Sequence, residues 1–334
     1  MEYSAGRDRR SRLCCLLGVV AAVLLCLGTA ASGELTDDFY DDCCPNLDRI
    51  VRARVSAAMK AEPRMGASLL RLHFHDCFVN GCDGSILLDG SNSEKLAAPN
   101  LNSARGFEVV DAIKADIERA CPGHVSCADV LALAAKYGVL LSGGPDYDVL
   151  LGRRDGLVAN QSGADSNLPG PDDSISDITK RFKDVGLNTT DMVVLSGGHT
   201  IGRSRCALFS NRLANFSATN SVDPTLDSAL ASSLQQVCRG GDGNQTAALD
   251  DGSADAFDNH YFKNLLAKKG LLSSDQILFS SADAAAATKA LVQAYGADSQ
   301  RFFCDFGNSM VKMGNIAPLT GSAGQIRKKC RAVN

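Results

Sequence analysis

The segment 71–85, with the sequence RLHFHDCFVNGCDGS, constrains the fold of this chain more than any other stretch. Arg71 and His75 are four residues apart, so a helix would place them on one face, about 6 Å from each other. Leu and Phe surround them, which predicts a buried helix, and a buried charge needs a structural or functional reason. A guanidinium can stabilise developing negative charge while a neighbouring imidazole takes a proton. The pair is therefore a candidate catalytic site, although most such pairs are ordinary polar faces of helices.

The second half of the same segment is typical of a cation-binding loop. Asp76, Asp83 and Ser85 offer hard oxygen ligands of the kind that Ca²⁺ prefers. Cys77 and Cys82 enclose a short loop that contains glycine, and this spacing suits a local disulfide. The sequence thus predicts a helix that ends in an ion-binding turn.

Apolar residues recur every three or four positions through most of the chain, which predicts an all-α fold, mainly helical with little β-structure. The clearest stripes lie in 110–121, 175–185 and 302–313, and Ser174 is a candidate N-cap for the second. The segment 239–254 is rich in Gly, Asp and Asn, which predicts a surface loop. No segment has the composition of a linker between independent domains.

The N-terminus has the pattern of a secretory signal. Four Arg residues precede an apolar run over 13–27, which is short for a membrane span, and small residues follow at 31–33. We expect residues 1–33 to be a cleaved signal peptide and residues 34–334 to form one domain. Cleavage leaves 30 basic and 36 acidic residues. This mildly acidic balance argues against nucleic acid or an anionic membrane as the main partner.

Ten cysteines remain after the expected cleavage, and in an exported chain they predict disulfides. A zinc site is a weaker interpretation, because the paired C-x-x-C sets that zinc requires do not occur. The sequence also contains four acceptor sites for N-glycosylation, at Asn160, Asn188, Asn215 and Asn244. These features together indicate an extracellular glycoprotein.

A second unusual histidine, His199, lies in the motif LSGGHTIG over 195–202. Thr190 can cap a short helix over 191–195, which the two glycines then end, so that the backbone packs closely around His199. From the residues alone, a core histidine bonded to the backbone is the more common outcome. Asp275, in GLLSSDQ, would by itself be an ordinary loop acid.

The motifs together resemble those of the class III plant haem peroxidases, from about residue 35 to residue 334. The segment 71–85 matches the distal-site motif of that family, and 195–202 matches the proximal one. Further matches are NSARGF at 102–107, VSCAD at 125–129, LGRRD at 151–155, FDN at 257–259 and MGNI at 313–316. The resemblance implies the haem peroxidase fold, in which a distal and a proximal half enclose the haem and disulfides staple the chain.

The resemblance also implies the disulfide pairs, which spacing alone does not choose. They are Cys44–Cys121, Cys77–Cys82, Cys127–Cys330 and Cys206–Cys238. Cys43 and Cys304 are left over. They could pair with each other or remain thiols, and Cys43 could compete with Cys44; we favour thiols.

The implied reaction reduces hydrogen peroxide and oxidises small phenolic donors in one-electron steps, with haem b as cofactor. The residues that the family motifs assign are His75 as general base, Arg71 as charge stabiliser, Asn100 as the partner of His75, His199 as the ligand of the haem iron, Asp275 as the partner of His199, and Pro169 as a carbonyl for the donor.

The resemblance further implies two Ca²⁺ ions, each beside one histidine motif. The first would use Asp76, the carbonyls of Val79 and Gly81, Asp83, Ser85 and, through water, Glu94. The second would use Thr200, Asp250, Ser253, the carbonyl of Ala256 and Asp258. From composition alone, the acidic segment 250–258 would be a solvated loop.

Several positions depart from the family pattern. Tyr147 stands where the family usually has Trp, and the positions where the family often has aromatic residues at the haem edge carry Ala98, Ile201 and Leu208. Donor preference is therefore the property that transfers least. The chain stops at residue 334 without the long extension of vacuolar members, so we expect secretion to the cell wall, no membrane association after cleavage, and a monomer.

Two other classes of function are compatible with parts of the sequence. A non-catalytic, Ca²⁺-stabilised binding protein could keep the same fold, but the complete histidine sets argue against it. A secreted hydrolase with a Ser/His/Asp set is disfavoured because the sequence lacks G-x-S-x-G.

Overall fold

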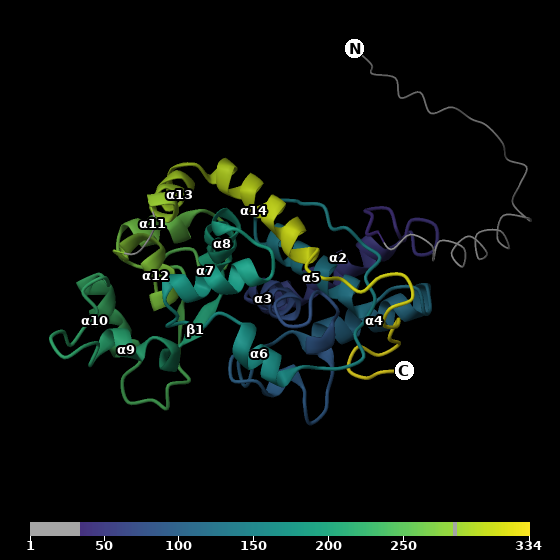
Figure 1. The fold of residues 1–334 in the computed structure, drawn as a ribbon, viewed down its shortest axis with the longest axis horizontal. Coiled ribbons are helices and arrows are strands. Elements are labelled where there is room, and N and C mark those ends of the chain that lie inside the picture. The colour runs from purple at the N-terminus through teal and green to yellow at the C-terminus, as the bar shows by residue number, and fades with distance from the viewer. Residues whose placement is uncertain (1–33, 283–285) are drawn as a thin grey trace, which may run out of the picture.

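The structure is a computed structural model that describes residues 34–282 and 286–334. The predicted signal peptide, residues 1–33, lies outside the described residues. The described chain is mainly helical, as predicted (Figure 1). Its helices are α2 (Leu47–Ala61), α3 (Met65–Cys77), α4 (Phe107–Ala120), α5 (Cys127–Leu141), α6 (Gln161–Asn167), α7 (Ile175–Asp184), α8 (Thr189–Ser196), α9 (Ser210–Leu213), α10 (Ser228–Val237), α11 (His260–Leu266), α12 (Ser273–Ser280), α13 (Ala286–Ala297) and α14 (Ser299–Gly314).

Short elements complete the chain. Four 3₁₀ turns occur in the described part, namely η1 (Ser85–Leu87), η2 (Glu94–Leu96), η3 (Gly197–Thr200) and η4 (Cys206–Leu208). The strands β1 (Arg203–Arg205) and β2 (Thr246–Ala248) pair antiparallel, with Arg203 opposite Ala248. The segment 239–254 is therefore only partly the surface loop that composition predicted, because 246–248 pairs with β1.

The three apolar stripes form helices, as predicted. α4 buries Val110, Ile113 and Ile117. The hydroxyl of Ser174 accepts a hydrogen bond from the backbone N–H of Asp177 and so caps α7. The stripe over 302–313 lies on the buried face of α14. Each helix forms because its apolar face packs into the core, and α7 and α14 also have an N-terminal side-chain cap.

The prediction that Thr190 caps α8 was wrong by two residues. The cap is Asn188, whose side-chain oxygen accepts hydrogen bonds from the backbone N–H groups of Thr190 and Asp191. The carboxylate of Asp191 in turn accepts from the backbone N–H of Asn188, which completes a capping box. The reciprocal bond satisfies two helix-end donors at once, and Thr190 offers no such pairing.

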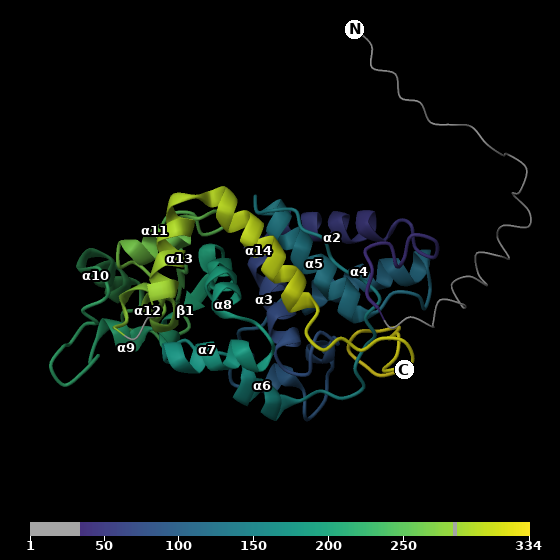
Figure 2. The ribbon, with the colours of Figure 1, turned by 45° about the horizontal axis from the view of Figure 1, so that its top comes forward.

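α3 lies between two hydrophobic cores. Leu69 and Leu72 pack with α2, α4 and α5, whereas Leu70 packs with α7, α8 and α11 to α14. Figures 1 and 2 show the same arrangement: α3 is central, with α2, α4 and α5 on one side and α8, α11 and α13 on the other. Gly66 permits a close crossing of α3 and α5, because a Cβ there would lie 2.9 Å from the carbonyl oxygen of Gly138. The Arg71/His75 helix is thus held from both sides.

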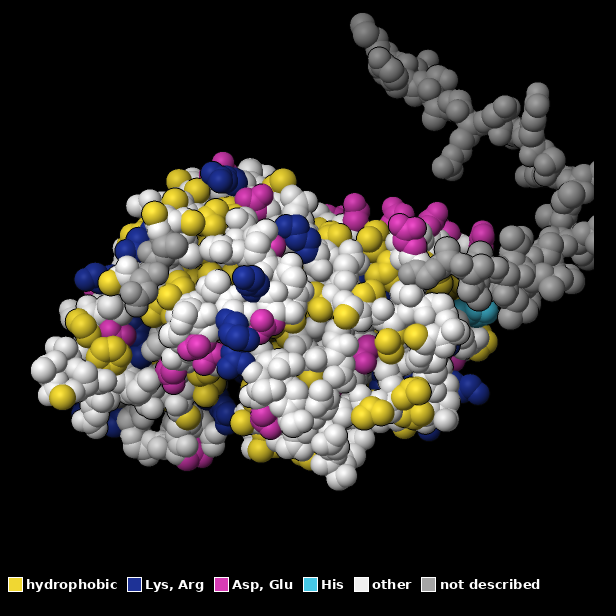
Figure 3. All heavy atoms as spheres, in the orientation of Figure 1, with side chains coloured by type: hydrophobic (Ala, Val, Ile, Leu, Met, Phe, Trp, Pro, Cys, Tyr) yellow, Lys and Arg dark blue, Asp and Glu magenta, His cyan; other side chains and the backbone are white. Residues whose placement is uncertain are grey.

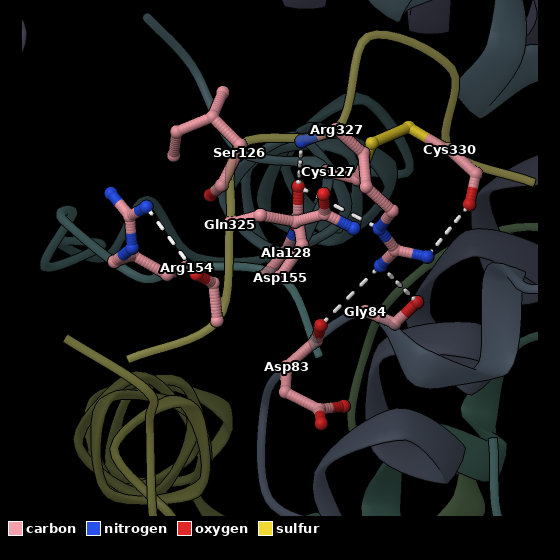
Figure 4. Close-up of polar contacts among 12 residues, drawn as sticks. Asp83, Gly84, Ser126, Cys127, Ala128, Arg154, Asp155, Gln325, Arg327 and Cys330 are labelled. Carbon is pink, nitrogen blue, oxygen red and sulfur yellow. Dashed lines mark hydrogen bonds and ion pairs between the residues drawn. A yellow bond between two sulfur atoms is a disulfide. The ribbon is translucent and has the colours of Figure 1, made fainter. Parts of the chain in front are cut away.

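All four disulfides form as the resemblance implied. Cys43 and Cys304 take part in none of them, and Cys304 is exposed. Figure 4 shows what surrounds the Cys127–Cys330 bond. The buried guanidinium of Arg327 donates to the carbonyl oxygens of Gly84, at 2.6 Å, and of Cys330, at 2.8 Å. The C-terminal segment is thereby fixed to the loop that follows α3.

A third, smaller core lies beneath α9, α10 and β2. In Figure 3 the surface is hollowed between the region of α9 and α10 and the region of α6. Across the two described ranges, none of the helices has both the length and the apolar character needed to cross a membrane.

Candidate active site

Arg71 and His75 meet on α3 as their spacing predicted. Arg71 Nε donates to His75 Nε2 at 3.2 Å. A second guanidinium nitrogen, Nη2, donates to the carbonyl oxygen of Pro99 at 2.7 Å and to the hydroxyl of Ser103 at 3.1 Å. The loop after η2 therefore fixes the direction of the guanidinium and holds it against the imidazole.

Asn100 sets the tautomer of His75. Its side-chain nitrogen donates to the carbonyl oxygen of Glu94 at 2.9 Å, so its side-chain oxygen is the atom that faces His75 Nδ1, at 2.5 Å. Nδ1 must then carry the proton, which leaves Nε2 as a free base. Burial and the charge of Arg71 hold the pKa of His75 well below its usual value, so the ring stays neutral.

His199 lies in η3, directly after α8. Its Nδ1 is 2.8 Å from Asp275 Oδ1, and Asp275 stands in the first turn of α12. The Asp275 side chain is 3% exposed, whereas 42% of the His199 side chain is open. Among the described residues, no group hydrogen-bonds the other ring nitrogen, Nε2. Burial works to lower the pKa of His199, but the charge and hydrogen bond of Asp275 outweigh it and raise that pKa.

The two histidine centres act on each other electrostatically. After burial and Arg71, the charge of His199 also contributes to the lowered pKa of His75, and the charge of Arg71 opposes protonation of His199. Since such effects fall off with distance, the two centres lie near each other in the fold. The structure therefore brings together five of the predicted residues: Arg71, His75 and Asn100 on one side, and His199 and Asp275 on the other.

Arg205 is a functional candidate that the sequence analysis missed. Its Nε is buried and has no hydrogen-bond partner among the described residues. Burial first, and then the charge of Arg205, lower the pKa of Arg71 to about 10. Two neighbouring guanidinium groups, one with an unpaired buried donor, suit a ligand with carboxylate groups. Haem carries two such groups, and the open Nε2 of His199 suits its iron, so these residues fit a haem.

The first predicted calcium site forms a buried acidic cluster. Asp76, Asp83 and Glu94 are all buried, and Ser85 Oγ and Glu94 Oε2 have no hydrogen-bond partner among the described residues. Burial and then the charges of Asp83 and Glu94 raise the pKa of Asp76 well above its usual value. Burial raises the pKa of Glu94 to about 7. Burial also raises the pKa of Asp83, and the charge of Arg327 offsets these shifts only in part, so the cluster keeps an excess of negative charge that a cation would balance.

The two carbonyl groups predicted for this site, those of Val79 and Gly81, point to a cation less clearly than the carboxylates do. The carbonyl oxygen of Gly81 accepts a hydrogen bond from the backbone N–H of Asp83, at 2.8 Å. Gly81 adopts φ of +88°, and a Cβ there would lie 2.5 Å from the carbonyl oxygen of Ala317. Val79 and Gly81 thus lie in a tight turn beside the cluster. Glycine is required at position 81, because a side chain there would be strained and would collide with Ala317.

The side chains predicted for the second calcium site also lie close together. Thr200 Oγ1 lies 3.1 Å from Asp250 Oδ2 and 3.0 Å from Asp258 Oδ1, and Ser253 Oγ lies 3.2 Å from Asp250 Oδ2. Ala256 closes the turn, since its backbone N–H donates to the carbonyl oxygen of Ser253. These side-chain oxygens belong to residues that are up to 58 positions apart in sequence, and they meet beside His199.

His260 has a closer relation to this second site than its sequence context indicated. Its Nδ1 lies 2.5 Å from Asp250 Oδ1. Asn264 Nδ2 donates to the same oxygen at 2.7 Å. The other oxygen of Asp250 thus remains for the hydroxyl cluster. The one signal available in sequence was the helical spacing of His260 and Asn264.

Two other candidates stay apart from these centres. Pro169 is half-buried between α6 and α7, and among the described residues no group donates a hydrogen bond to its carbonyl. His73 points away from His75 and lies 3.7 Å from the Cys77 sulfur. Burial, with the charge of Arg153, lowers the pKa of His73 to about 3. His73 is therefore a neutral core residue.

Comparison with known proteins agrees with this geometry. The family model described as peroxidase matches residues 51–298. Peroxidase N of Armoracia rusticana is 58% identical, with 96% of each chain covered. Peroxidase 54 of Arabidopsis thaliana is 52% identical over 96% of this chain and 89% of its own. The lignin-forming anionic peroxidase of Nicotiana tabacum is 47% identical over 95% of this chain and 99% of its own. This chain is therefore an enzyme of the peroxidase family, in its plant class III branch, whose cofactor is of the haem type.

Proposed function

We propose that this enzyme is a secreted haem b peroxidase that reduces hydrogen peroxide and takes single electrons from small phenolic donors. The observation that supports the proposal is the presence of two histidine centres, one with a neutral base beside a guanidinium and the other with an open Nε2. The tobacco relative is named a lignin-forming peroxidase, which supports a phenolic donor.

His199 is the proposed ligand of the haem iron. Its Nε2 is the free nitrogen, and its Nδ1 proton is held by Asp275, which would give the ring imidazolate character. Arg205 is the residue that would bind a carboxylate group of the cofactor, through its unpaired buried Nε. Haem, when bound, supplies the redox chemistry that divides the O–O bond of peroxide.

His75 is the proposed general base. Its neutral Nε2 takes a proton from one oxygen of peroxide and returns it to the other, which leaves as water. Asn100 keeps the ring in the tautomer that allows this, because it holds the proton on Nδ1. Arg71 stabilises the negative charge on the leaving oxygen, and its bonds to Pro99 and Ser103 keep it in place.

The remaining assignments complete the proposal. Pro169 offers its carbonyl to the hydroxyl of the donor. Two Ca²⁺ ions occupy the acidic cluster beside His75 and the hydroxyl-rich cluster beside His199, with the ligands given above. The mature enzyme is residues 34–334, it acts as a monomer, and it is exported to the cell wall or extracellular space.

A visible spectrum tests the central claim. The full-length chain is purified, loaded with haem, and scanned before and after one equivalent of hydrogen peroxide. We expect an intense Soret band, a change of that band with peroxide, and recovery on addition of a phenolic donor. The variant His199→Ala should lose the band, whereas the exposed-loop variant His124→Ala should keep it. A wild-type protein that stays colourless would refute the proposal.

A further inference from the structure

Asp275 accepts two side-chain hydrogen bonds at a single oxygen. Its Oδ1 lies 2.8 Å from His199 Nδ1 and 3.0 Å from the hydroxyl oxygen of Tyr261. Its other oxygen, Oδ2, lies 3.4 Å from the backbone nitrogen of Leu272, which is a longer and weaker contact. The imidazole and the phenol therefore compete for the same lone-pair region of one carboxylate.

The hydroxyl of Tyr261 is committed to this bond. The residue is 1% exposed, and among the described residues its hydroxyl has no other hydrogen-bond partner. The ring packs edge-on against Phe262, with 5.0 Å between centroids, and edge-on against His199, at 6.4 Å. Burial and the charge of Asp275 raise the pKa of Tyr261 well above its usual value, so the hydroxyl remains a donor at any working pH.

We propose that Tyr261 is a positioning residue that weakens the pull of Asp275 on the Nδ1 proton of His199 and thereby raises the reduction potential of the haem iron. This inference rests on the proposed ligation of the iron by His199. It assigns to α11 a role in tuning the cofactor that the sequence analysis did not recognise.

The direction follows from how a carboxylate shares its charge. Each donor withdraws electron density from Oδ1. A hydrogen bond from Tyr261 therefore weakens Asp275 as an acceptor for the Nδ1 proton of His199. Without the hydroxyl, Asp275 would attract the Nδ1 proton more strongly and the ring would gain imidazolate character. A more anionic ligand favours ferric over ferrous iron, so the potential should fall.

Tyr261→Phe tests the proposal, since it removes the hydroxyl and keeps the ring. The full-length, haem-loaded variant is titrated electrochemically, and the iron–histidine stretch of its ferrous form is measured by resonance Raman. The loss of one charge-assisted hydrogen bond changes an equilibrium constant by roughly one to two factors of ten. We expect the ferric form to be favoured about tenfold more, which for a one-electron couple is a fall of about 59 mV, with an upward shift of the stretch.

Tyr295→Phe is the matched control. Tyr295 is also a buried tyrosine of the same core, and its hydroxyl also donates to a carboxylate, Asp305 Oδ2, at 2.8 Å. It also packs against Phe262. Loss of its hydroxyl should leave the potential and the stretch unchanged. An equal shift in both variants would show general loosening of the core and would overturn the proposal.

A double variant tests whether Tyr261 acts through Asp275. In an Asp275→Asn background, Tyr261→Phe should have no further effect on the potential; the same fall in that background would overturn the proposal. An unchanged or higher potential in Tyr261→Phe alone would also do so. If instead the wild-type protein shows no iron–histidine stretch, the ligation by His199 fails, and the two failures are thus distinguishable.

Discussion

Removal of calcium from the first proposed site should make the free energy of unfolding fall as the pH rises. The site holds Asp76, Asp83 and Glu94, all buried, and burial raises the pKa of each. With a cation present, the three carboxylates are ionised and the cation balances their negative charge. Without it, the folded protein must either bury uncompensated charge or keep these groups protonated.

The magnitude can be worked out for Glu94, whose side chain is fully buried. Its pKa is about 7 instead of 4.5, and each pKa step of one corresponds to 1.36 kcal/mol. Glu94 alone therefore destabilises the calcium-free protein by about 3 kcal/mol above pH 7. Between pH 4.5 and 7 the folded state binds more protons than the unfolded state, so the free energy of unfolding falls as the pH rises.

Urea unfolding at pH 5 and pH 8, with either EDTA or excess calcium, measures this effect. With EDTA, the stability of the wild type should fall by about 2.5 kcal/mol more than that of Glu94→Gln over this range, because a small part of the effect is already present at pH 5. Glu108→Gln, at an exposed position of α4, is the control and should behave as the wild type. The reasoning fails if EDTA changes nothing at pH 8, or if Glu94→Gln and the wild type show the same pH dependence.

Three further predictions concern catalysis, stability and modification. Arg71→Leu and His75→Ala should each slow the reaction with peroxide by about 10²–10⁴ in stopped-flow experiments, because each removes one catalytic group; a wild-type rate would contradict the assignment. Arg153→Leu leaves the buried carboxylate of Asp129 without its 2.8 Å partner, so urea unfolding should show a loss of about 3–5 kcal/mol. Peptide mass spectrometry should find Asn160 unglycosylated, because its side-chain nitrogen is half-buried and bonded to Asn80; glycan there would contradict this. The exposed acceptor sites are Asn188, Asn215 and Asn244.

The parts of the site that the residues alone could predict are local in sequence. Arg71 and His75 meet because helical geometry brings together residues four apart, and Asp76, Asp83 and Ser85 lie close in sequence, between the end of α3 and the start of η1. The apolar stripes of α4, α7 and α14 likewise depend only on periodicity. By contrast, the pairing of His199 with Asp275 spans 76 residues, and it came from family resemblance.

The features that were missed depend on long-range placement. Arg327 reaches the loop at Gly84 across 243 residues, and no local pattern marks it as a buried anchor. Tyr261 could not be identified from sequence, because nothing in its own segment indicates which carboxylate its hydroxyl contacts. β2 is three residues long, below the length at which alternation becomes visible. Asn188 and Thr190 are both capping residue types, and only the reciprocal bond with Asp191 decides between them.

Glu94 links the proposed metal site to the proposed base. Its carboxylate belongs to the buried acidic cluster, and its carbonyl oxygen accepts the hydrogen bond from Asn100 that turns the amide oxygen toward His75. A shift of Glu94 would therefore change both the direction of Asn100 and the basicity of His75 Nε2. The carboxylate and the carbonyl belong to one residue of a single 3₁₀ turn, so neither can move far alone. The cation thus has a physical route to the catalytic proton, which explains why an ion that touches no reactant would still affect the rate of the reaction with peroxide.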